Sequence, residues 1–109
     1  MGMIARRWSG SVRAEDSEPY QAYLLDTGLK DYRNTPGNLG SQLLRRVEED
    51  LVHFEITSFW KDEESIRLFA GEDIGKAVFY PMDQRYLVRK DERVAHFELA
   101  FLEGPRSLD

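Results

Sequence analysis

Two histidines are the side chains of this chain best suited to proton transfer near neutral pH. His53 and His96 each stand two residues before a glutamate, Glu55 and Glu98 respectively. On a strand this spacing puts both side chains on one face, and a neighbouring carboxylate raises the pKa of a histidine. We predict His96 as a catalytic base. The alternative for both histidines is a hydrogen-bonded strand residue near the rim, which we favour for His53.

Aromatic residues and one arginine are candidates for a substrate pocket. Trp60 ends an apolar run, and Trp8 shares a strand face with Arg6, which could anchor an anionic group. Tyr80 precedes a proline, which favours extended backbone, and it could point its hydroxyl into a cleft, as could Tyr20 or Tyr23 from the first helix. The alternative is that the aromatic residues pack the core and that the arginine lies on the surface with its stem over an apolar neighbour.

Composition excludes several classes of site and partner. The chain has no cysteine, so disulfides, thiolate metal sites and cysteine nucleophiles are excluded. Two histidines alone do not make a metal site, so we expect neither metal nor cofactor. The net charge of −5 argues against nucleic acid as a partner. No apolar run is long enough for a membrane span and none resembles a signal peptide, so we predict a cytoplasmic protein with no membrane partner.

The first half of the chain predicts a strand, a helix and a hairpin. A length of 109 residues suits one domain, residues 1–109, with a loose tail at 104–109. Residues 3–12 form the first strand, and apolar residues at helical spacing predict a helix from residue 14 that ends at Gly28, before a loop at 34–37. Alternation predicts a strand over 39–47, paired through an acidic turn with a strand over 51–60.

The second half predicts another helix and a last strand. Asp62 is a suitable N-cap and Gly71 a suitable end for the second helix. Residues 74–78 suggest a further short turn of helix, and residues 81–87 an irregular segment or helical turn. Residues 93–102 are predicted as the last strand.

Five segments of the chain are distinctive: MIARRWSG (3–10), TPGNLGSQLLRR (35–46), FWKDEESIRLFAGED (59–73), FYP (79–81) and VAHFEL (94–99). In this order they resemble segments of the antibiotic biosynthesis monooxygenase-like proteins of the dimeric α+β barrel superfamily. The resemblance covers residues 3–102, to an uncharacterised branch of these proteins, and carries no catalytic signature. It implies a ferredoxin-like βαββαβ fold with a four-stranded antiparallel sheet, an aromatic residue facing the cleft at Trp60, and a dimer whose sheets close into a barrel.

The resemblance also bears on the reaction. Haem-degrading members carry an iron-binding histidine after the second helix, but the matching stretch KAVFYP (76–81) has none. Cofactor-free members instead hold an electron-rich phenol or quinol among aromatic and polar residues. Trp8, Trp60, Tyr80 and Arg6 are the residues of this chain that could serve, with His96 as the base, since the implied strand order places Arg6 and His96 on neighbouring strands.

The last strand suggests how the chain assembles. It is apolar on both faces, with Phe97, Leu99 and Phe101 on one and Val94, Ala100 and Leu102 on the other. Two short helices cover only one face of a sheet, so a homodimer through the other face is expected. The alternative is that long loops cover these residues.

Three functions fit these observations. The first is a cofactor-independent monooxygenase acting on a small aromatic or polyketide-like substrate. The second is a protein that binds a small molecule without chemistry, and the third a structural homodimer with a filled cleft. The cleft itself distinguishes them.

Overall fold

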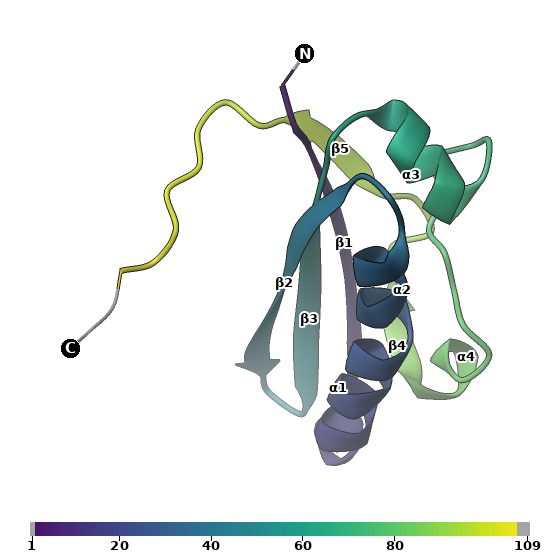
Figure 1. Cartoon of the computed structure of the whole chain (residues 1–109). Coiled ribbons are helices and arrows are strands. Elements are labelled where there is room, and N and C mark those ends of the chain that lie inside the picture. The colour runs from purple at the N-terminus through teal and green to yellow at the C-terminus, as the bar shows by residue number, and fades with distance from the viewer. Residues whose placement is uncertain (1, 107–109) are drawn as a thin grey trace.

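One antiparallel sheet forms the frame of the molecule, described for residues 2–106 in a computed structural model (Figure 1). Its strands lie in the order β2-β3-β1-β4, and β5 also pairs with β1. The strands are β1 (Ile4–Arg13), β2 (Asn38–Glu48), β3 (Leu51–Trp60), β4 (Leu87–Lys90) and β5 (Ala95–Glu98). The helices are the 3-10 turn η1 (Ala14–Asp16), α1 (Ser17–Asp26), α2 (Gly28–Asn34), α3 (Glu63–Ala70) and α4 (Asp83–Tyr86). This confirms the predicted α+β fold of ferredoxin-like βαββαβ order.

The central strands bury one face of the sheet under the helices. In β3 every second residue is buried, from Val52 to Trp60, and the residues between them are half-buried. Cross-strand pairing puts Trp8 opposite Ile56, so the even-numbered residues of β1 share this face. α1 and α2 lie across it (Figure 1). The core therefore sits between the sheet and these helices.

The hairpin and the start of α3 confirm the sequence prediction. Asp50 and Glu49, which has a positive φ of 58°, make the turn between β2 and β3. The Asp62 side chain caps α3 by accepting a hydrogen bond from the Ser65 backbone N–H at 2.9 Å. Gly71 ends the helix with a φ of 89°, a conformation that favours glycine. The short helical turn expected at residues 74–78 is wrong, whereas α4 is the helical turn expected within residues 81–87.

The first helical region does not end at Gly28. Thr27 only interrupts it, with φ −116° and ψ −91°, and its hydroxyl donates to the Tyr23 carbonyl at 2.7 Å. The Asp31 N–H then bonds the Thr27 carbonyl, so α2 continues the helical path to Asn34. The threonine side chain thus satisfies a backbone carbonyl at the break, where the sequence pattern points to the glycine.

The expected last strand at residues 93–102 is shorter and has a companion. β4 and β5 both run antiparallel to β1 along the same edge, with Lys90 opposite Gly10 and Ala95 opposite Arg7. Residues 91–94 between them leave the ladder, so the fourth strand is one edge strand interrupted by an irregular stretch. From Leu99, whose N–H still bonds the Met3 carbonyl, the chain leaves the sheet.

The face of the sheet opposite the helices, here called the open face, has an apolar end and a polar end. Cross-strand pairing aligns Phe59, Ala5 and Phe97 in one row. A second row near the other end of the strands is polar, and it consists of Arg46, His53, Ser11 and Arg89. The open face is thus less uniformly apolar than the last strand suggests.

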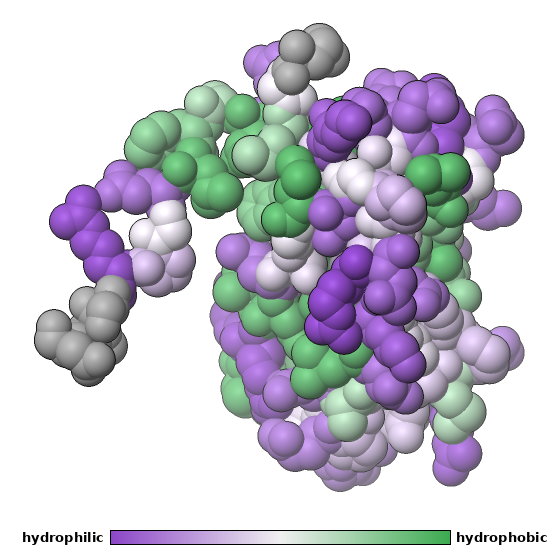
Figure 2. Space-filling model, viewed as in Figure 1, coloured by the Kyte–Doolittle hydropathy of each residue, from purple (hydrophilic) through white to green (hydrophobic). Residues whose placement is uncertain are grey.

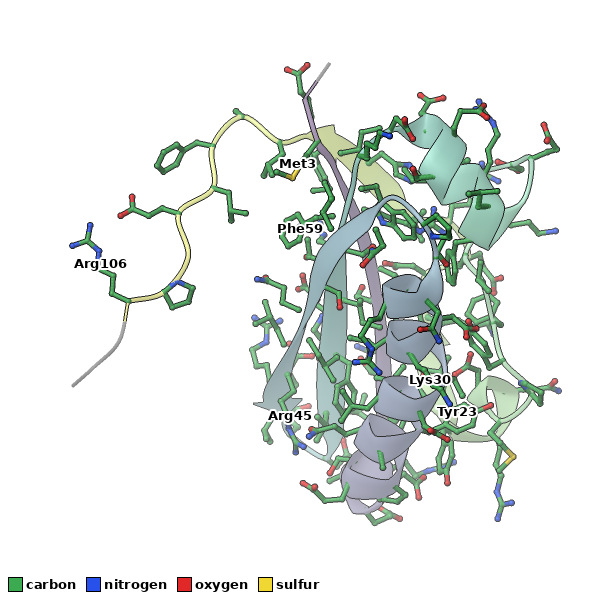
Figure 3. The ribbon with its side chains drawn as sticks, in the orientation of Figure 1. Met3, Tyr23, Lys30, Arg45, Phe59 and Arg106 are labelled. Carbon is green, nitrogen blue, oxygen red and sulfur yellow. The ribbon has the colours of Figure 1, made fainter. Side chains whose placement is uncertain are left out.

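The C-terminal tail reaches away from the body of the molecule (Figure 1). Phe101 is 77% exposed and Leu102 54%, and Figure 2 shows apolar residues gathered where the tail leaves the body. Met3 and Phe59 lie near the root of the tail, whereas Arg106 lies far out on it (Figure 3). Residues 107–109 of the predicted loose tail fall outside the described residues. Within residues 2–106 no helix is long and apolar enough to cross a bilayer.

Candidate functional site

A narrow cavity lies between the sheet and the helices. The centre of a water-sized sphere can occupy about 30 Å³ of it. That is room for about two water molecules. Its apolar walls are Trp8, Leu24, Ile56, Phe69, Val78 and Val94. Its polar residues are Arg6, Tyr20, Thr27, Tyr32, Tyr80 and Asp83.

Arg6 brings a buried positive charge to the cavity. The side chain projects from β1 and only 2% of the residue is exposed. Its guanidinium donates to the backbone carbonyls of Ile74 and Lys76, and lies 5.8 Å from the Phe69 ring centroid. Among the described residues, no carboxylate oxygen lies within 4.0 Å of it. Burial lowers the pKa of Arg6, but a guanidinium stays protonated in proteins. Its polar partners are the two carbonyls and the His96 imidazole, and none of them carries a negative charge.

His96 stands beside Arg6 and does not line the cavity. The two residues are cross-strand partners on β5 and β1, with the Arg6 Nη1 3.1 Å from the His96 Nε2. A guanidinium has only donors, so Nε2 is the acceptor and the ring proton sits on Nδ1. Burial, and then the charge of Arg6, lower the pKa of His96. The lone pair that a base would use is therefore engaged by Arg6.

Asp83 brings a buried negative charge to the same cavity. It begins α4 and is 6% exposed. One carboxylate oxygen accepts a hydrogen bond from the Tyr20 hydroxyl at 2.9 Å, and the other accepts one from the Tyr80 backbone N–H at 2.6 Å. Burial, and then the charge of Asp83, raise the pKa of Tyr20, so that hydroxyl remains protonated. A carboxylate offers about four lone-pair positions, so two such bonds leave it further accepting capacity.

The irregular stretch of residues 71–82, here called the cover segment, closes the cavity. Two backbone hydrogen bonds hold its middle. The Ala77 N–H donates to the Glu92 carbonyl at 3.0 Å, and the Val94 N–H donates to the Gly75 carbonyl at 2.8 Å. Near the C-terminal end of the segment, the Tyr80 hydroxyl donates to Asp31 of α2 at 2.6 Å. Burial, and then this hydrogen bond, raise the pKa of Tyr80.

Tyr80 and Asp83 separate the cavity from the outside. Both residues also line an outer depression, together with Phe79, Pro81, Gln84 and Lys90. The inner cavity and the outer depression thus share one wall. A molecule that enters from this side passes Tyr80.

The two tryptophans take different positions. Trp8 lines the cavity, with its indole N–H donating to the Asp91 carbonyl at 2.9 Å. Trp60 is fully buried behind the wall, and its indole N–H donates to the Ser58 hydroxyl at 2.9 Å. Its ring packs at 5.9 Å against both Tyr32 and Phe69, which do line the cavity. The structure thus brings Arg6, Trp8 and Tyr80 together, with Trp60 supporting the wall.

The cavity is also lined by a row of residues on the first helical region, of which the sequence interpretation considers only Tyr20. Tyr20, Leu24, Gly28 and Tyr32 all line it and follow one another at intervals of four. This spacing is the stripe of a continuous helix, and it is obscured when Gly28 is taken as a helix end. Asp83 has no comparable signal, since its position depends on the path of the cover segment.

His53 lies on the open face, away from the cavity. Its Nδ1 is 3.2 Å from the Ser11 hydroxyl and its Nε2 3.4 Å from Glu55. It is a hydrogen-bonded strand residue, in line with the interpretation favoured for it. Within residues 2–106, no three His, Cys, Asp or Glu side chains gather in a way that would hold a metal ion.

Solved structures share this fold at low sequence identity. The cofactor-independent oxygenase SnoaB from Streptomyces nogalater matches with a TM-score of 0.59 and 13% identity, over 99% of this chain and 98% of that one. The heme-degrader MhuD from Mycobacterium tuberculosis matches with a TM-score of 0.60 and 19% identity, over 94% and 99%. A Nitrosomonas europaea protein proposed to be an antibiotic biosynthesis monooxygenase matches with a TM-score of 0.68 and 12% identity, over 95% and 97%.

These likenesses establish the fold, which is that of the antibiotic biosynthesis monooxygenase-like proteins. At such identities they do not carry a substrate or a residue role across to this chain. No family model matches the sequence, and no curated protein matches it.

Proposed function

We propose that this protein is a cofactor-independent monooxygenase for a small aromatic substrate that reacts as an anion. Oxygenase chemistry is named for proteins of the same fold, SnoaB among them. The cavity of this chain has the flat apolar walls and the single cation that such a substrate needs.

The main observation behind the proposal is that the Arg6 guanidinium is buried and forms no ion pair with a carboxylate among the described residues. Removing a charge from water is costly unless it is paired, and the two carbonyls offset that cost only in part. An anionic oxygen of a ligand would complete the pairing through charge-assisted hydrogen bonds. Arg6 therefore supports binding of a phenolate or enolate, beside the aromatic surfaces of Trp8 and Phe69.

The proposed reaction needs oxygen and no added reductant. A substrate with an activated methylene gives a proton to a base of the site, and the carbanion gives its electron pair to molecular oxygen. The peroxide anion that results takes the proton back and becomes a hydroperoxide. The hydroperoxide then loses water. One methylene group and one oxygen molecule thus become one ketone carbonyl and one water molecule. Arg6 would stabilise the delocalised anion before oxygen adds.

Substrate entry requires movement of the cover segment. The space open inside the cavity holds about two waters, which is too little for an aromatic ring. Tyr80 stands between the cavity and the outer depression, and its bond to Asp31 fixes one end of the segment. Opening there would admit a ligand without disturbing the sheet.

His96 has a proposed role through Arg6. The sequence predicts it as the base, and it lies 3.1 Å from the guanidinium that would hold the substrate anion. With its Nε2 accepting from Arg6, His96 fixes the direction of the guanidinium. We therefore propose that His96 is a positioning residue for Arg6. Substitution of His96 by glutamine and by alanine distinguishes this role from proton abstraction.

We also propose that the chain is one domain and forms a homodimer through the open face. The support is the apolar row Phe59, Ala5 and Phe97, together with the exposed Phe101 and Leu102 of the tail. Apolar patches of this kind are usually covered. A homodimer that binds a small molecule without chemistry is the alternative function.

Oxygen uptake measured with an electrode tests the proposal. Wild type, Arg6→Gln and Arg33→Gln are each incubated with hydroxylated aromatic compounds that carry an activated methylene. Arg33 is an exposed arginine of α2 and serves as the matched control. We expect uptake with wild type and Arg33→Gln and none with Arg6→Gln. Binding without uptake by the wild type would favour the non-catalytic alternative.

A further inference from the structure

The cavity holds two buried charges of opposite sign that do not pair with each other. Arg6 is 2% exposed and Asp83 6%, and both line the same narrow space. Neither takes part in an ion pair within 4.0 Å among the described residues. Each is held by neutral groups, Arg6 by two carbonyls and the His96 imidazole, and Asp83 by a tyrosine hydroxyl and a backbone N–H. The cavity therefore offers a ligand a cation and a carboxylate that are not paired with each other.

We propose that Asp83 is the proton acceptor of this cavity, and that its ligand is a conjugated hydroxy compound with an acceptor oxygen at the opposite end. This inference rests on the proposed function of the same cavity. The ligand hydroxyl meets Asp83, and the distant carbonyl or nitro oxygen meets Arg6. Hydroxyaryl ketones and hydroxyquinones have this arrangement.

The proton transfer is balanced within the complex. The O–H bond of the ligand breaks and its proton moves to a free lone pair of the Asp83 carboxylate. The electron pair left on the ligand delocalises through the ring to the acceptor oxygen beside Arg6. The negative charge thus moves from Asp83 to the ligand oxygen beside Arg6. The Arg6 guanidinium is a buried cation without a carboxylate partner among the described residues. This is favourable because opposite charges attract more strongly in a site without water.

The residues around Asp83 favour it over His96 for this task. Asp83 lines the cavity, whereas His96 does not and has its Nε2 engaged by Arg6. The Tyr20 hydroxyl fixes the carboxylate on α4, and the Tyr80 N–H also does so when the cover segment is closed. An acceptor held in one orientation needs no rearrangement before it takes the proton.

The test uses 4-nitrophenol, whose neutral and ionised forms absorb at different wavelengths. Wild type, Asp83→Asn and Asp26→Asn are titrated with it at a pH where the free phenol is mostly neutral. Asp26 is an exposed aspartate of α1 and the matched control. We expect wild type and Asp26→Asn to bind the probe as phenolate. We expect Asp83→Asn to bind it as the neutral phenol, with loss of the phenolate band.

A second measurement needs only the wild type, so it tests the inference even if Asp83→Asn does not fold. Calorimetry in two buffers of different ionisation enthalpy counts the protons released on binding. A phenolate complex that releases no proton to the buffer supports Asp83, because the proton has stayed on the protein. A phenolate complex that releases one proton overturns the inference but leaves anion binding at Arg6 intact.

The remaining outcomes are also decisive. A probe bound to the wild type as neutral phenol overturns proton acceptance by Asp83. A phenolate band that persists in Asp83→Asn does the same. Absence of binding to the wild type overturns this inference, whereas the proposed function fails only if the wild type takes up no oxygen with the hydroxylated aromatic compounds, so the two failures are distinguishable.

Discussion

Arg6 and His96 face each other across β1 and β5, with the guanidinium Nη1 3.1 Å from the imidazole Nε2. The two residues are 90 positions apart along the chain, and they meet because β5 returns along the edge of β1. The pair links the histidine that the sequence favours for chemistry to the cation that lines the cavity.

Substitution of His96 separates positioning from proton abstraction. His96→Gln keeps an acceptor for Arg6, whereas His96→Ala does not. If His96 only positions Arg6, we expect kcat/KM of any oxygenated substrate to fall about tenfold in His96→Ala, which corresponds to about 1.4 kcal/mol. We expect His96→Gln to retain most activity. Equal and complete loss in both variants would show that His96 itself takes the proton.

The stability of the protein should depend on pH through His96. Burial and Arg6 lower the pKa of this histidine in the folded protein, with Glu63 acting in the opposite direction. In the unfolded chain its pKa is about 6.5. The unfolded chain therefore binds the proton first, so stability falls as pH drops through about 6.5 toward the lowered folded pKa. Below that folded pKa the contribution stays constant.

Urea unfolding of wild type and His96→Gln across this pH range measures the effect. We expect His96→Gln to flatten the slope. An unchanged slope in His96→Gln would contradict the prediction.

Gly10 should resist substitution because Trp8 occupies its side-chain space. A Cβ atom there would lie 2.7 Å from the Trp8 Cη2 and 2.9 Å from the Leu87 Cδ2. We expect Gly10→Ala to shift the indole and to lower the free energy of unfolding by about 1–3 kcal/mol. Gly104→Ala is the neutral control, because a Cβ atom at Gly104 would have open space for 4 Å around it. Equal stability of the two variants, measured by denaturant unfolding, would contradict this.

Loss of the Tyr80 hydroxyl should loosen the cover segment. Tyr80→Phe removes the 2.6 Å bond to Asp31 and leaves the ring in place. We expect hydrogen exchange in residues 77–82 to become about five- to tenfold faster, the equivalent of one hydrogen bond of about 1 kcal/mol. Tyr86→Phe on α4 is the control, because no hydrogen bond of its hydroxyl is present among the described residues. Exchange at the wild-type rate in Tyr80→Phe would show that the bond does not hold the segment.

The proposed dimer predicts which apolar residues matter for assembly. Phe97→Ser combined with Phe101→Ser should shift the protein to monomer, whereas Leu68→Ser should not, although Leu68 is 68% exposed on α3. Light scattering after gel filtration measures the mass of each variant. A wild type that is monomeric at micromolar concentration would refute the proposal.

The strands were more predictable from the sequence than their ends. β3 has the predicted bounds because its apolar pattern runs unbroken into Trp60 and is followed by the capping Asp62. The predicted last strand is too long because Leu99, Phe101 and Leu102 are apolar without lying in the sheet of their own chain. Local pattern does not distinguish residues that pack within the chain from residues that lie exposed on a tail.

The site was predictable where it depended on one element. Arg6 and Trp8 share a face because strand residues alternate, and both line the cavity. Tyr32 could have been found from its helical spacing with Tyr20. Asp83 could not, since it reaches the cavity only through the course of residues 71–82, which follows no repeating pattern.

The interruption at residues 91–94 has a consequence for how this protein avoids aggregation. An uninterrupted edge strand offers a row of free N–H and C=O groups on which another chain can assemble. Here the exposed edge is divided into β4 and β5, each of four residues, and neither is a long template. Asp91, in the break, turns its carboxylate back onto Ser9 of β1 at 2.9 Å. The irregularity that shapes the wall beside Trp8 thus also protects this edge of the sheet from pairing with the strand of another chain.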